Sequence, residues 1–368
     1  MLKYQIALSL INGIGPKLAR NLITYLGSVE NVFLPNSQFE KIPGIGSIMS
    51  KRLKSVDKGS LLARAEKEID YIKKQNINTF FFTDENYPSR LSFCEDAPLL
   101  LFAKGNVNLE SPKIVSIVGT RKPTDEGLIL CEKLVIDIAK RHPGTIIVSG
   151  LAYGIDICAH RAALKNNLPT IAVLAHGLDR IYPGIHSGTA REISKNGALL
   201  SEFMTGTNPD RPNFVKRNRI VAGLCDTVVV VESAHKGGAL ITAGIAASYN
   251  RDVLAFPGRV NDTASEGCNK LIKTNIAALI ESIEDLEYAL GWESETNSEE
   301  STQGALFKAP DNPQEKKIID LLITEKEMNL NLLSIASGIP IPKLSATLLD
   351  LEFKGLVKSK PGGIFKLL

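Results

Sequence analysis

Hydrophobic and polar positions divide the chain into three stretches with different periodicity. In residues 1–75, apolar positions recur with helical spacing, and two similar turns interrupt them, Ile11–Pro16 and Ile42–Gly46. From Asn76 the pattern changes to short β-branched runs that alternate with helical stretches. Such alternation is typical of a parallel sheet with crossover helices. The pattern therefore predicts an α/β protein with a helical domain in front of its sheet.

The middle stretch, residues 76–291, predicts a Rossmann-like parallel sheet with crossover helices. Its expected strands are Ile114–Val118, Ile146–Ser149, Ile171–Leu174, Ala198–Ser201, Thr227–Val231 and Val253–Ala255. The expected helices are Glu126–Arg141, Asp156–Asn166, Ser187–Asn196, Asn213–Gly223, Gly238–Tyr249 and Gly267–Thr274. Because the strands are almost continuously apolar, we expect helices to cover both faces of the sheet.

The last stretch predicts a linker and a small third domain. Residues 292–313 are rich in Glu, Ser, Thr, Asn, Gln and Pro and have little to bury, which favours a solvated linker. Residues 314–368 then predict a winged helix, with helices Gln314–Thr324, Asn329–Ser337 and Pro342–Lys354 before a two-stranded wing, Leu356–Ser359 and Ile364–Leu367. The third helix and the wing carry few lysines, which is less positive charge than duplex DNA recognition usually requires. Duplex DNA binding and protein docking therefore both stay open for the domain.

The two turns of the helical front form an internal repeat. Each contains Gly-Ile-Gly, which lets the backbone turn tightly and leaves amides unpaired at the start of the next helix, where a phosphate can sit. Both copies resemble helix-hairpin-helix motifs, so we expect a helix-hairpin-helix or SAM-like domain. The nearby cations are Lys17, Arg20, Lys51 and Arg52. Contact with DNA and simple helix packing are both compatible with this pattern.

Composition and charge narrow the class of protein. The 368 residues carry a net charge of +3, so a nucleic-acid site has to come from local clusters of Lys and Arg. Five cysteines are widely spaced, and they form no CxxC pair or zinc pattern with the five histidines. The sequence shows no signal peptide and no apolar run of membrane-spanning length. We therefore expect reduced thiols, no metal, no membrane contact and a cytoplasmic location.

Glycines and small polar residues gather where three predicted strands end. The turns are Gly119–Lys122, Ser149–Asp156 and Glu232–Ala239, and each leads into a helix. In an open parallel sheet, ligands bind at the carboxyl ends of the strands. Glycine lets backbone amides approach an anion, and the helix dipole adds about 0.3–1 kcal/mol for an exposed charge. These turns predict a phosphate-binding edge.

Nucleotide chemistry is disfavoured by the motifs that are missing from the sequence. There is no GxxxxGK[ST], and no GxGxxG follows a predicted strand. We therefore expect no ATP hydrolysis, no dinucleotide cofactor and no catalytic residue. Asp156 and His160 share a helix face, yet we interpret Asp156 as a cap of the helix amides and His160 as a polar residue beside the edge. Glu232 is expected to pair with a backbone amide or an arginine.

The predicted helix Asn213–Gly223 brings three cations to the same region. Lys216 and Ile220 share one helix face, whereas Arg217 and Arg219 diverge by about 200°. One phosphate therefore cannot be held by all three cations. We expect one or two of them to face the ligand and one to pair internally, with Asp226 or with Glu202.

Five stretches of the chain closely resemble the DNA-processing protein A family, also called Smf. They are Ile117–Arg121, Ser149–His160, Gly177–Pro183, Phe214–Ile220 and Lys236–Thr242. The resemblance implies an extended Rossmann fold that dimerises. It also implies a non-enzymatic recombination mediator of natural transformation, which binds single-stranded DNA, displaces single-strand-binding protein and loads the RecA recombinase. It implies phosphate contact by Arg121, pocket donors from Ser149 and Gly150, and a channel lined by Lys216 to Arg219.

Together these patterns define one predicted site for single-stranded DNA. Its residues are Gly119, Thr120, Arg121, Ser149, Gly150, Gly154, Phe214, Lys216, Arg217, Asn218, Arg219, Lys236, Gly237, Gly238 and Thr242. The family often has a basic residue after Tyr-Pro, whereas here Tyr182-Pro183 precedes Gly184 and Ile185. His186 is a candidate for a partial substitute.

Two other functions remain as alternatives. The sheet with its Gly-Gly helix start is similar to nucleotide phosphoribohydrolases of the lysine-decarboxylase-like family, which cleave a base from a nucleoside monophosphate. Their Pro-Gly-Gly-x-Gly-Thr motif followed by a glutamate is replaced here by His235–Ala239. The other alternative is a scaffold in which the winged helix regulates transcription and the central domain senses a nucleotide.

Overall fold

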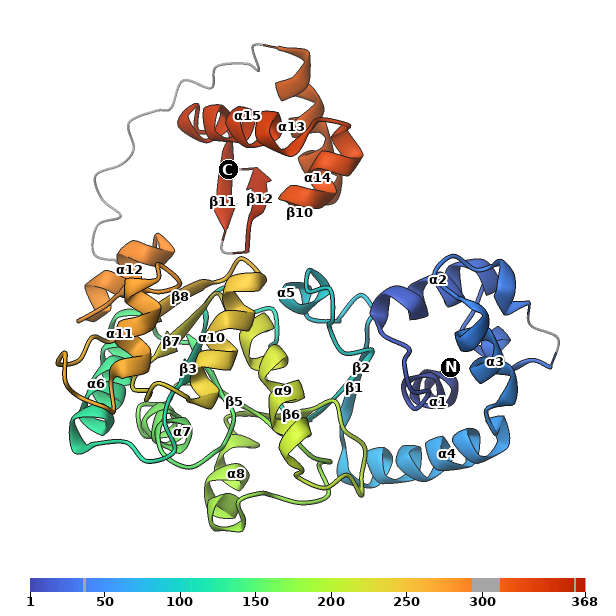
Figure 1. Cartoon of the computed structure of the whole chain (residues 1–368), viewed down its shortest axis with the longest axis horizontal. Coiled ribbons are helices and arrows are strands. Elements are labelled where there is room, and N and C mark those ends of the chain that lie inside the picture. Colours follow the sequence, from blue (N-terminus) through green and yellow to red (C-terminus); the bar gives the residue numbers. More distant parts are fainter. Residues whose placement is uncertain (36–37, 107, 293–311, 361, 368) are drawn as a thin grey trace.

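A computed structural model describes residues 1–35, 38–106, 108–292, 312–360 and 362–367. It contains a helical front, a large sheet with helices on both faces, and a small carboxyl-terminal winged helix (Figure 1). The predicted α/β class with an extended Rossmann-like sheet and a winged helix is therefore confirmed.

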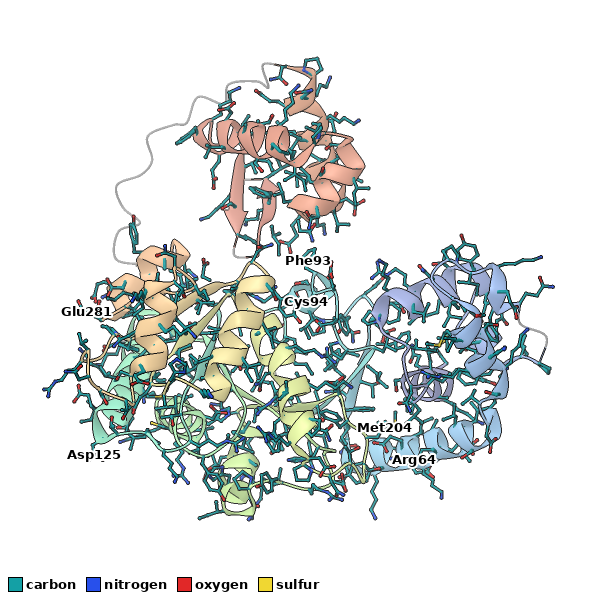
Figure 2. All side chains as sticks on the ribbon, viewed as in Figure 1. Arg64, Phe93, Cys94, Asp125, Met204 and Glu281 are labelled. Atoms are coloured by element: carbon teal, nitrogen blue, oxygen red, sulfur yellow. The ribbon has the colours of Figure 1, made fainter. Side chains whose placement is uncertain are left out.

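The front of the chain is helical and packs against the sheet. Its elements are α1 (Leu2–Ser9), α2 (Pro16–Leu26), η1 (Glu30–Phe33), η2 (Phe39–Lys41), α3 (Ser47–Ser55) and α4 (Lys58–Gln75). Ile6 and Leu22 belong to the same buried cluster as Leu101 and Leu200 of the sheet, so one apolar core spans both parts. On α4, Arg64 donates from Nη2 to the carbonyl of Thr205 at 2.6 Å, beside the labelled Met204 (Figure 2).

The sheet has nine strands among the described residues, in the order β1-β2-β6-β5-β4-β3-β7-β8-β9. Their bounds are β1 Asn78–Phe81, β2 Leu100–Gly105, β3 Ile114–Val118, β4 Ile146–Ser149, β5 Thr170–Val173, β6 Gly197–Ser201, β7 Thr227–Val230, β8 Asp252–Ala255 and β9 Ala278–Leu279. The strands from β6 to β9 are parallel, whereas β1 pairs antiparallel with β2 and β2 pairs antiparallel with β6. All six predicted strands are present, and β1, β2 and β9 were not predicted.

Helices cover both faces of the parallel strands, as the apolar strands require. The remaining helical elements are α5 (Ser89–Ser92), α6 (Asp125–Arg141), α7 (Ile155–Lys165), η3 (Gly184–His186), α8 (Ser187–Ile193), α9 (Arg211–Gly223), α10 (Gly238–Ser248), α11 (Glu266–Lys273) and α12 (Ile283–Leu290). The buried side chains of α9 and α10 join the cluster shared with the front, and those of α6 and α12 form a second cluster on the other face.

Strand order places the switch point of the sheet beside β3. The chain runs outward from β3 through β4 and β5 to β6, then returns to the other side of β3 with β7 and continues to β8. The loops that follow β3 and β7 therefore lead to helices on opposite faces of the sheet, α6 and α10. In sheets of this topology, the crevice at such a point is the usual ligand site.

The carboxyl-terminal residues form a winged helix with its own small core. Its elements are α13 (Pro313–Glu325), β10 (Glu327–Asn329), α14 (Leu330–Ser337), α15 (Ile341–Phe353), β11 (Val357–Lys360) and β12 (Ile364–Leu367). The sheet order is β10-β12-β11, so the wing has a third short strand that was not predicted. Ile318, Leu333 and Leu348 are central to the core that these elements enclose.

The proposed domain boundaries at residues 75 and 291 stay predictions. Of the predicted linker, residues 292–313, the part 293–311 lies outside the described residues. Within the described ranges no single helix is long and apolar enough to cross a membrane, while one pair bent by 106°, Leu330–Ser337 with Ile341–Phe353, meets that test by length and composition.

Candidate functional site

Three glycine turns meet at the carboxyl edge of the sheet, and we call them the glycine crest: Gly119–Thr124 after β3, Ser149–Gly154 after β4, and Glu232–Gly238 after β7. Main-chain hydrogen bonds join them. The amide of Thr120 donates to the carbonyl of Glu232 at 2.8 Å, and the amide of Ile155 donates to the carbonyl of Thr120 at 3.2 Å. The turn after β3 is thus fixed to both of its neighbours.

Glycine is required where two of these turns touch. Gly154 has φ +78°, and a Cβ there would lie 2.2 Å from the carbonyl oxygen of Thr120. A Cβ on Gly119 would lie 2.5 Å from Cγ1 of Ile155. No other residue allows this close approach without moving the backbone. The predicted residues Gly119, Thr120 and Gly154 are therefore brought together.

The third turn leads into α10 with its amides uncapped by a side chain. Gly237 is the N-cap residue, and α10 begins at Gly238. Lys236, directly before them, is exposed. The helix therefore presents free amides and a cation at the edge. Thr242 lies elsewhere: it is buried in α10, and its hydroxyl donates to the carbonyl of Gly238 at 3.4 Å.

Arg217 lies beneath the crest and is 4% exposed. Its Nη1 donates to the carbonyl of Val173 at 2.6 Å. A Cβ on Gly150 would lie only 1.8 Å from that same nitrogen, so glycine leaves the space that the guanidinium occupies. Burial lowers the pKa of Arg217 to about 10, and the charge of Asp156 opposes that shift. Arg217 places a positive charge just below the surface of the edge.

The other cations of α9 divide as the helix geometry predicted. Arg219 donates from Nη2 to Glu202 at 2.5 Å, so it is the internally paired cation, and Glu202 is the partner. Asp226, the other candidate, instead binds Nε of Arg90 at 2.8 Å. Lys216 has a 55% exposed side chain and also contacts Glu202, at 3.2 Å. Asn218 is partly exposed.

Two predicted donors of the turn after β4 are already engaged. The hydroxyl of Ser149, which is fully buried, donates to the carbonyl of Ile117 at 2.6 Å. The amide of Gly150 donates to Oδ2 of Asp156 at 3.1 Å, and the amide of Ala152 to the same oxygen at 3.4 Å. Asp156 therefore caps the preceding turn, and the expectation that it caps the helix amides is wrong.

The remaining polar residues near the crest stabilise it internally. Glu232 accepts the amide of Thr124 at 3.0 Å, which confirms pairing with a backbone amide. His160 donates from Nδ1 to the hydroxyl oxygen of Thr170 at 2.7 Å, and burial lowers the pKa of His160 to about 3. His186 is 4% exposed and donates from Nδ1 to the carbonyl of Leu151 at 2.9 Å. His186 therefore does not replace the missing basic residue.

Aromatic rings border the cationic side of the crest. Phe214 lies with its ring centroid 5.5 Å from the guanidinium carbon of exposed Arg121 and 5.9 Å from the ring of Tyr182. Tyr153, whose ring is 5.2 Å from that of His186, is 47% exposed, and Tyr182 is 46% exposed. The sequence prediction omitted both tyrosines, although an aromatic residue inside a glycine turn was a usable signal.

The carboxyl edge is not uniform in charge. A pocket of about 800 Å³ borders the crest between Thr124, the start of α6, the end of β7 and the segment after β8. Four carboxylates line it, those of Glu126, Glu232, Asp262 and Glu281, with Arg259 as its cation. The exposed cations Arg121 and Lys216 are not among the residues that line it. An anionic chain is therefore favoured on the side of Arg121 and Lys216, toward β4 and β5, and disfavoured beside α6, β7 and β8. Among the described side chains, no three His, Cys, Asp or Glu gather as metal ligands would.

The two turns of the helical front lie against each other. Nη1 of Arg52 donates to the carbonyl of Asn12 at 2.9 Å, and Nδ2 of Asn21 donates to the carbonyl of Pro43 at 2.8 Å. The N-cap residues of α2 and α3 are glycines, and neither provides a side-chain cap. The amides of both helix starts stay available, and DNA contact at this place stays a prediction.

Comparisons with known proteins agree with this architecture. Residues 78–291 match the model of DNA recombination-mediator protein A, and residues 305–363 match the DprA winged helix domain. Protein Smf of Synechocystis sp. is 31% identical, covering 98% of this chain and 97% of the relative. DNA processing protein DprA of Streptococcus pneumoniae is 41% identical, covering 58% and 74%.

Two solved structures share the fold of this chain and also have clear sequence similarity to it. The X-ray structure of DNA processing protein A from S. pneumoniae superposes with a TM-score of 0.64 at 32% identity and covers 78% of this chain and 98% of that one. The structure of DNA processing protein A from Helicobacter pylori, described for its single-stranded DNA binding mode, has a TM-score of 0.52 at 33% identity and covers 58% and 94%. The chain therefore belongs to the DNA recombination-mediator protein A family and is a DNA-processing recombination mediator.

Proposed function

We propose that the glycine crest binds single-stranded DNA through its phosphates, without sequence preference and without catalysing a reaction. The observation that carries this proposal is the joining of three glycine turns beside exposed Arg121 at the switch point of the sheet. Free amides at the start of α10 and the cations Lys216 and Lys236 provide further contacts for an anionic chain. Binding of single strands by the H. pylori relative supports the same assignment.

The predicted site residues take different positions in this proposal. Arg121, Lys216, Lys236 and Phe214 contact the strand, while Gly119, Thr120, Gly154, Gly237 and Gly238 shape the backbone beneath it. Arg217, Ser149 and Gly150 support the surface from below, because their polar groups are engaged inside the protein. Arg219 and Thr242 are held by internal partners, and Asn218 lies at the side of the path.

Replacing Arg121 with alanine tests the phosphate contact. The variant should lose one charge-assisted contact, about 1.5–3 kcal/mol of binding free energy for an oligo-dT strand, while its unfolding stays unchanged. The plot of log affinity against log salt should also become shallower by about 0.7, the value for one phosphate on a single strand. Fluorescence anisotropy over a salt series measures both quantities, with Arg191→Ala on α8 as the control. Unchanged affinity in Arg121→Ala, or equal wild-type binding of duplex and oligo-dT, would contradict the proposal.

Replacing Tyr182 with alanine tests whether the aromatic rings stack on bases. Loss of one stacked base should cost about 1–3 kcal/mol of binding free energy. Because no charge is removed, the salt slope should stay at its wild-type value, unlike that of Arg121→Ala. Tyr288→Ala is the matched control, since Tyr288 lies on α12 and is 92% exposed. If Tyr182→Ala and Tyr288→Ala bind equally well, the rings do not contact the strand.

We further propose that the bound strand is delivered to a RecA recombinase, with displacement of single-strand-binding protein, during natural transformation. Membership of a recombination-mediator family supports this role. RecA-dependent ATP hydrolysis on DNA coated with single-strand-binding protein should start sooner when the protein is added, and Arg121→Ala should lose this effect. An unchanged lag would argue against delivery.

We also expect the protein to be a homodimer, which light scattering measures. The purified protein should release no adenine from AMP.

A further inference from the structure

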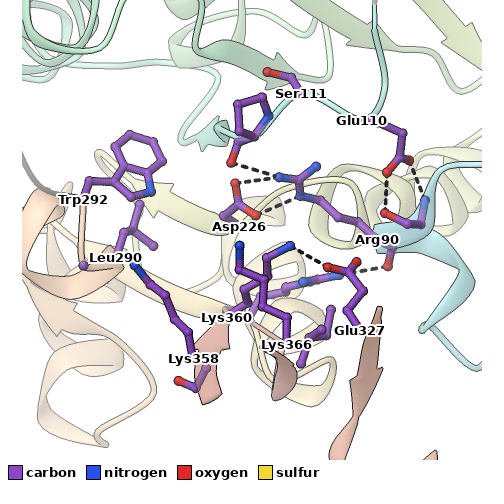
Figure 3. Close-up of a pocket in the computed structure, with 16 residues that line it drawn as sticks. Arg90, Glu110, Ser111, Asp226, Leu290, Trp292, Glu327, Lys358, Lys360 and Lys366 are labelled. Atoms are coloured by element: carbon purple, nitrogen blue, oxygen red, sulfur yellow. Dashed lines mark hydrogen bonds and ion pairs between the residues drawn. The ribbon is translucent and has the colours of Figure 1, made fainter. Parts of the chain in front are cut away.

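A cationic pocket lies at the other end of the molecule, between the wing and the amino edge of the sheet (Figure 3). We call it the wing pocket, and its volume is about 320 Å³. Lys358, Lys360 and Lys366 line it from the wing, and Arg90, Asp226 and Trp292 line it from the central part. The glycine crest is at the opposite, carboxyl edge of the same strands, so the two sites are separate.

The register of the wing directs its lysines to one face. Lys358 on β11 lies directly opposite Lys366 on β12, and Lys360 is two residues further along β11. Like charges opposite each other destabilise a strand pair. Glu327 is opposite Lys366 on β10, but its carboxylate binds Nζ of Lys360 at 2.5 Å. Within the described ranges, Lys358 and Lys366 have no carboxylate partner, so no ion pair of the protein neutralises their charges there.

The two carboxylates on the central side of the wing pocket, those of Asp226 and Glu110, accept hydrogen bonds from neighbouring residues. Asp226 accepts Nε and Nη2 of Arg90 at 2.8 and 3.0 Å, and it also accepts the amide of Ile114 at 2.9 Å. Glu110 accepts the amide and the hydroxyl of Ser89 at 2.7 and 2.6 Å. Asp226 is therefore neutralised by Arg90, whereas Glu110 has only neutral donors and can offset one further positive charge. Five cations and three carboxylates line the pocket among the described residues, and the excess is positive.

The wing is seated closely enough to make this a defined site. Gly362, in the turn between β11 and β12, has φ +90°, and a Cβ there would lie 2.5 Å from Nη1 of buried Arg251. Any other residue would strain the backbone at this φ and would displace the guanidinium of Arg251. On the other wall, the indole of Trp292 is held by Lys113, whose Nζ lies 5.0 Å from the ring centroid. The pocket therefore combines unpaired lysines with a fixed aromatic ring.

We propose that the wing pocket binds a nucleoside di- or triphosphate. Lys358 and Lys366 contact its phosphates as point charges, and the indole of Trp292 lies beside its base. The pocket volume is within the range of small-molecule sites. Because the lysines come from the wing and the indole from the central part, the ligand holds the winged helix against the sheet.

The test uses the fluorescence of Trp292, the only tryptophan in the sequence. Titration of the full chain with ADP should give a saturable change, and inorganic pyrophosphate should compete with ADP. The double variant Lys358→Gln, Lys366→Gln should weaken ADP binding at least about tenfold. The double variant Lys316→Gln, Lys317→Gln removes two exposed lysines of α13 and serves as the charge-matched control, which should bind as the wild type does.

Several outcomes would overturn the proposal. They are no fluorescence change at millimolar ADP, equal ADP binding by Lys358→Gln, Lys366→Gln and the wild type, and a response to oligo-dT but to neither ADP nor pyrophosphate. Arg121→Ala should respond to ADP as the wild type does, because the crest is a different site. Loss of the ADP response in Arg121→Ala would therefore also contradict it.

Discussion

Replacing Arg217 with glutamine is expected to lower the free energy of unfolding by about 3 kcal/mol at neutral pH. Arg217 is buried, its guanidinium binds the carbonyl of Val173, and its charge faces that of Asp156. Burial raises the pKa of Asp156, and the positive charge of Arg217 opposes this rise. Without Arg217, the carboxylate of Asp156 would have to stay ionised in the interior with its nearby charge removed.

The effect should depend on pH in one direction. Below an ordinary aspartate pKa of about 4, Asp156 is protonated in both the folded and the unfolded chain, so the loss of the neighbouring charge matters least. Above the raised pKa of Asp156 in the wild type, the folded wild type ionises this carboxyl beside Arg217, whereas the folded variant, which lacks that charge, still resists ionisation. The difference in stability between Arg217→Gln and the wild type should therefore grow as pH rises.

Urea unfolding between about pH 5 and pH 8 measures this difference. Lys216→Gln removes the neighbouring charge of α9, and because its side chain is exposed it should change stability by no more than about 1 kcal/mol, with little dependence on pH. A pH-independent loss of stability in Arg217→Gln would mean that packing, and not the charge facing Asp156, explains the role of Arg217.

Replacing Gly150 with alanine is expected to damage stability and binding together. The added methyl carbon would lie 1.8 Å from Nη1 and 2.4 Å from Cζ of Arg217, so either the turn or the guanidinium has to move. Because Arg217 is enclosed, we expect a loss of about 1–3 kcal/mol in unfolding free energy. The displaced turn should also weaken oligo-dT binding by about tenfold.

Gly184→Ala provides the matched control for this substitution. A Cβ at Gly184 would meet nothing within 4 Å, so the same chemical change should be neutral there. Urea unfolding and fluorescence anisotropy are measured on both variants. If Gly150→Ala behaves like Gly184→Ala, the close contact between the turn and Arg217 is not maintained in solution.

Much of the fold could be predicted because the local sequence pattern indicates its strands and helices. The six central strands are apolar runs bounded by glycine turns, and their predicted ends differ from the observed ones by at most one residue. β9 and β10 have only 2 and 3 residues, which is too short for a periodic pattern. β1 and β2 sit at an antiparallel edge, where pairing partners far apart in the chain decide whether a short run becomes a strand.

The sequence could predict which turns form the site, but not which of the nearby side chains are buried. Glycine spacing indicated correctly that the turns after β3, β4 and β7 meet. Helix geometry also separated the three cations of α9, and Glu202 was one of the two partners considered for them. Which arginine is buried depends on how α9 packs against β5, and periodicity does not contain that information. For the same reason, the sequence could not reveal that Ser149 uses its hydroxyl inside the sheet.

Two of the bonds that join the turn after β3 to its neighbours use only the main chain of Thr120, its amide toward Glu232 and its carbonyl toward Ile155. Nineteen of the twenty amino acids could provide both groups, and proline alone lacks the donor. This part of the edge is thus independent of the side chain at position 120. Substitution of Arg121 or Lys122 can therefore raise or lower the affinity for a ligand while the main chain beneath keeps its shape.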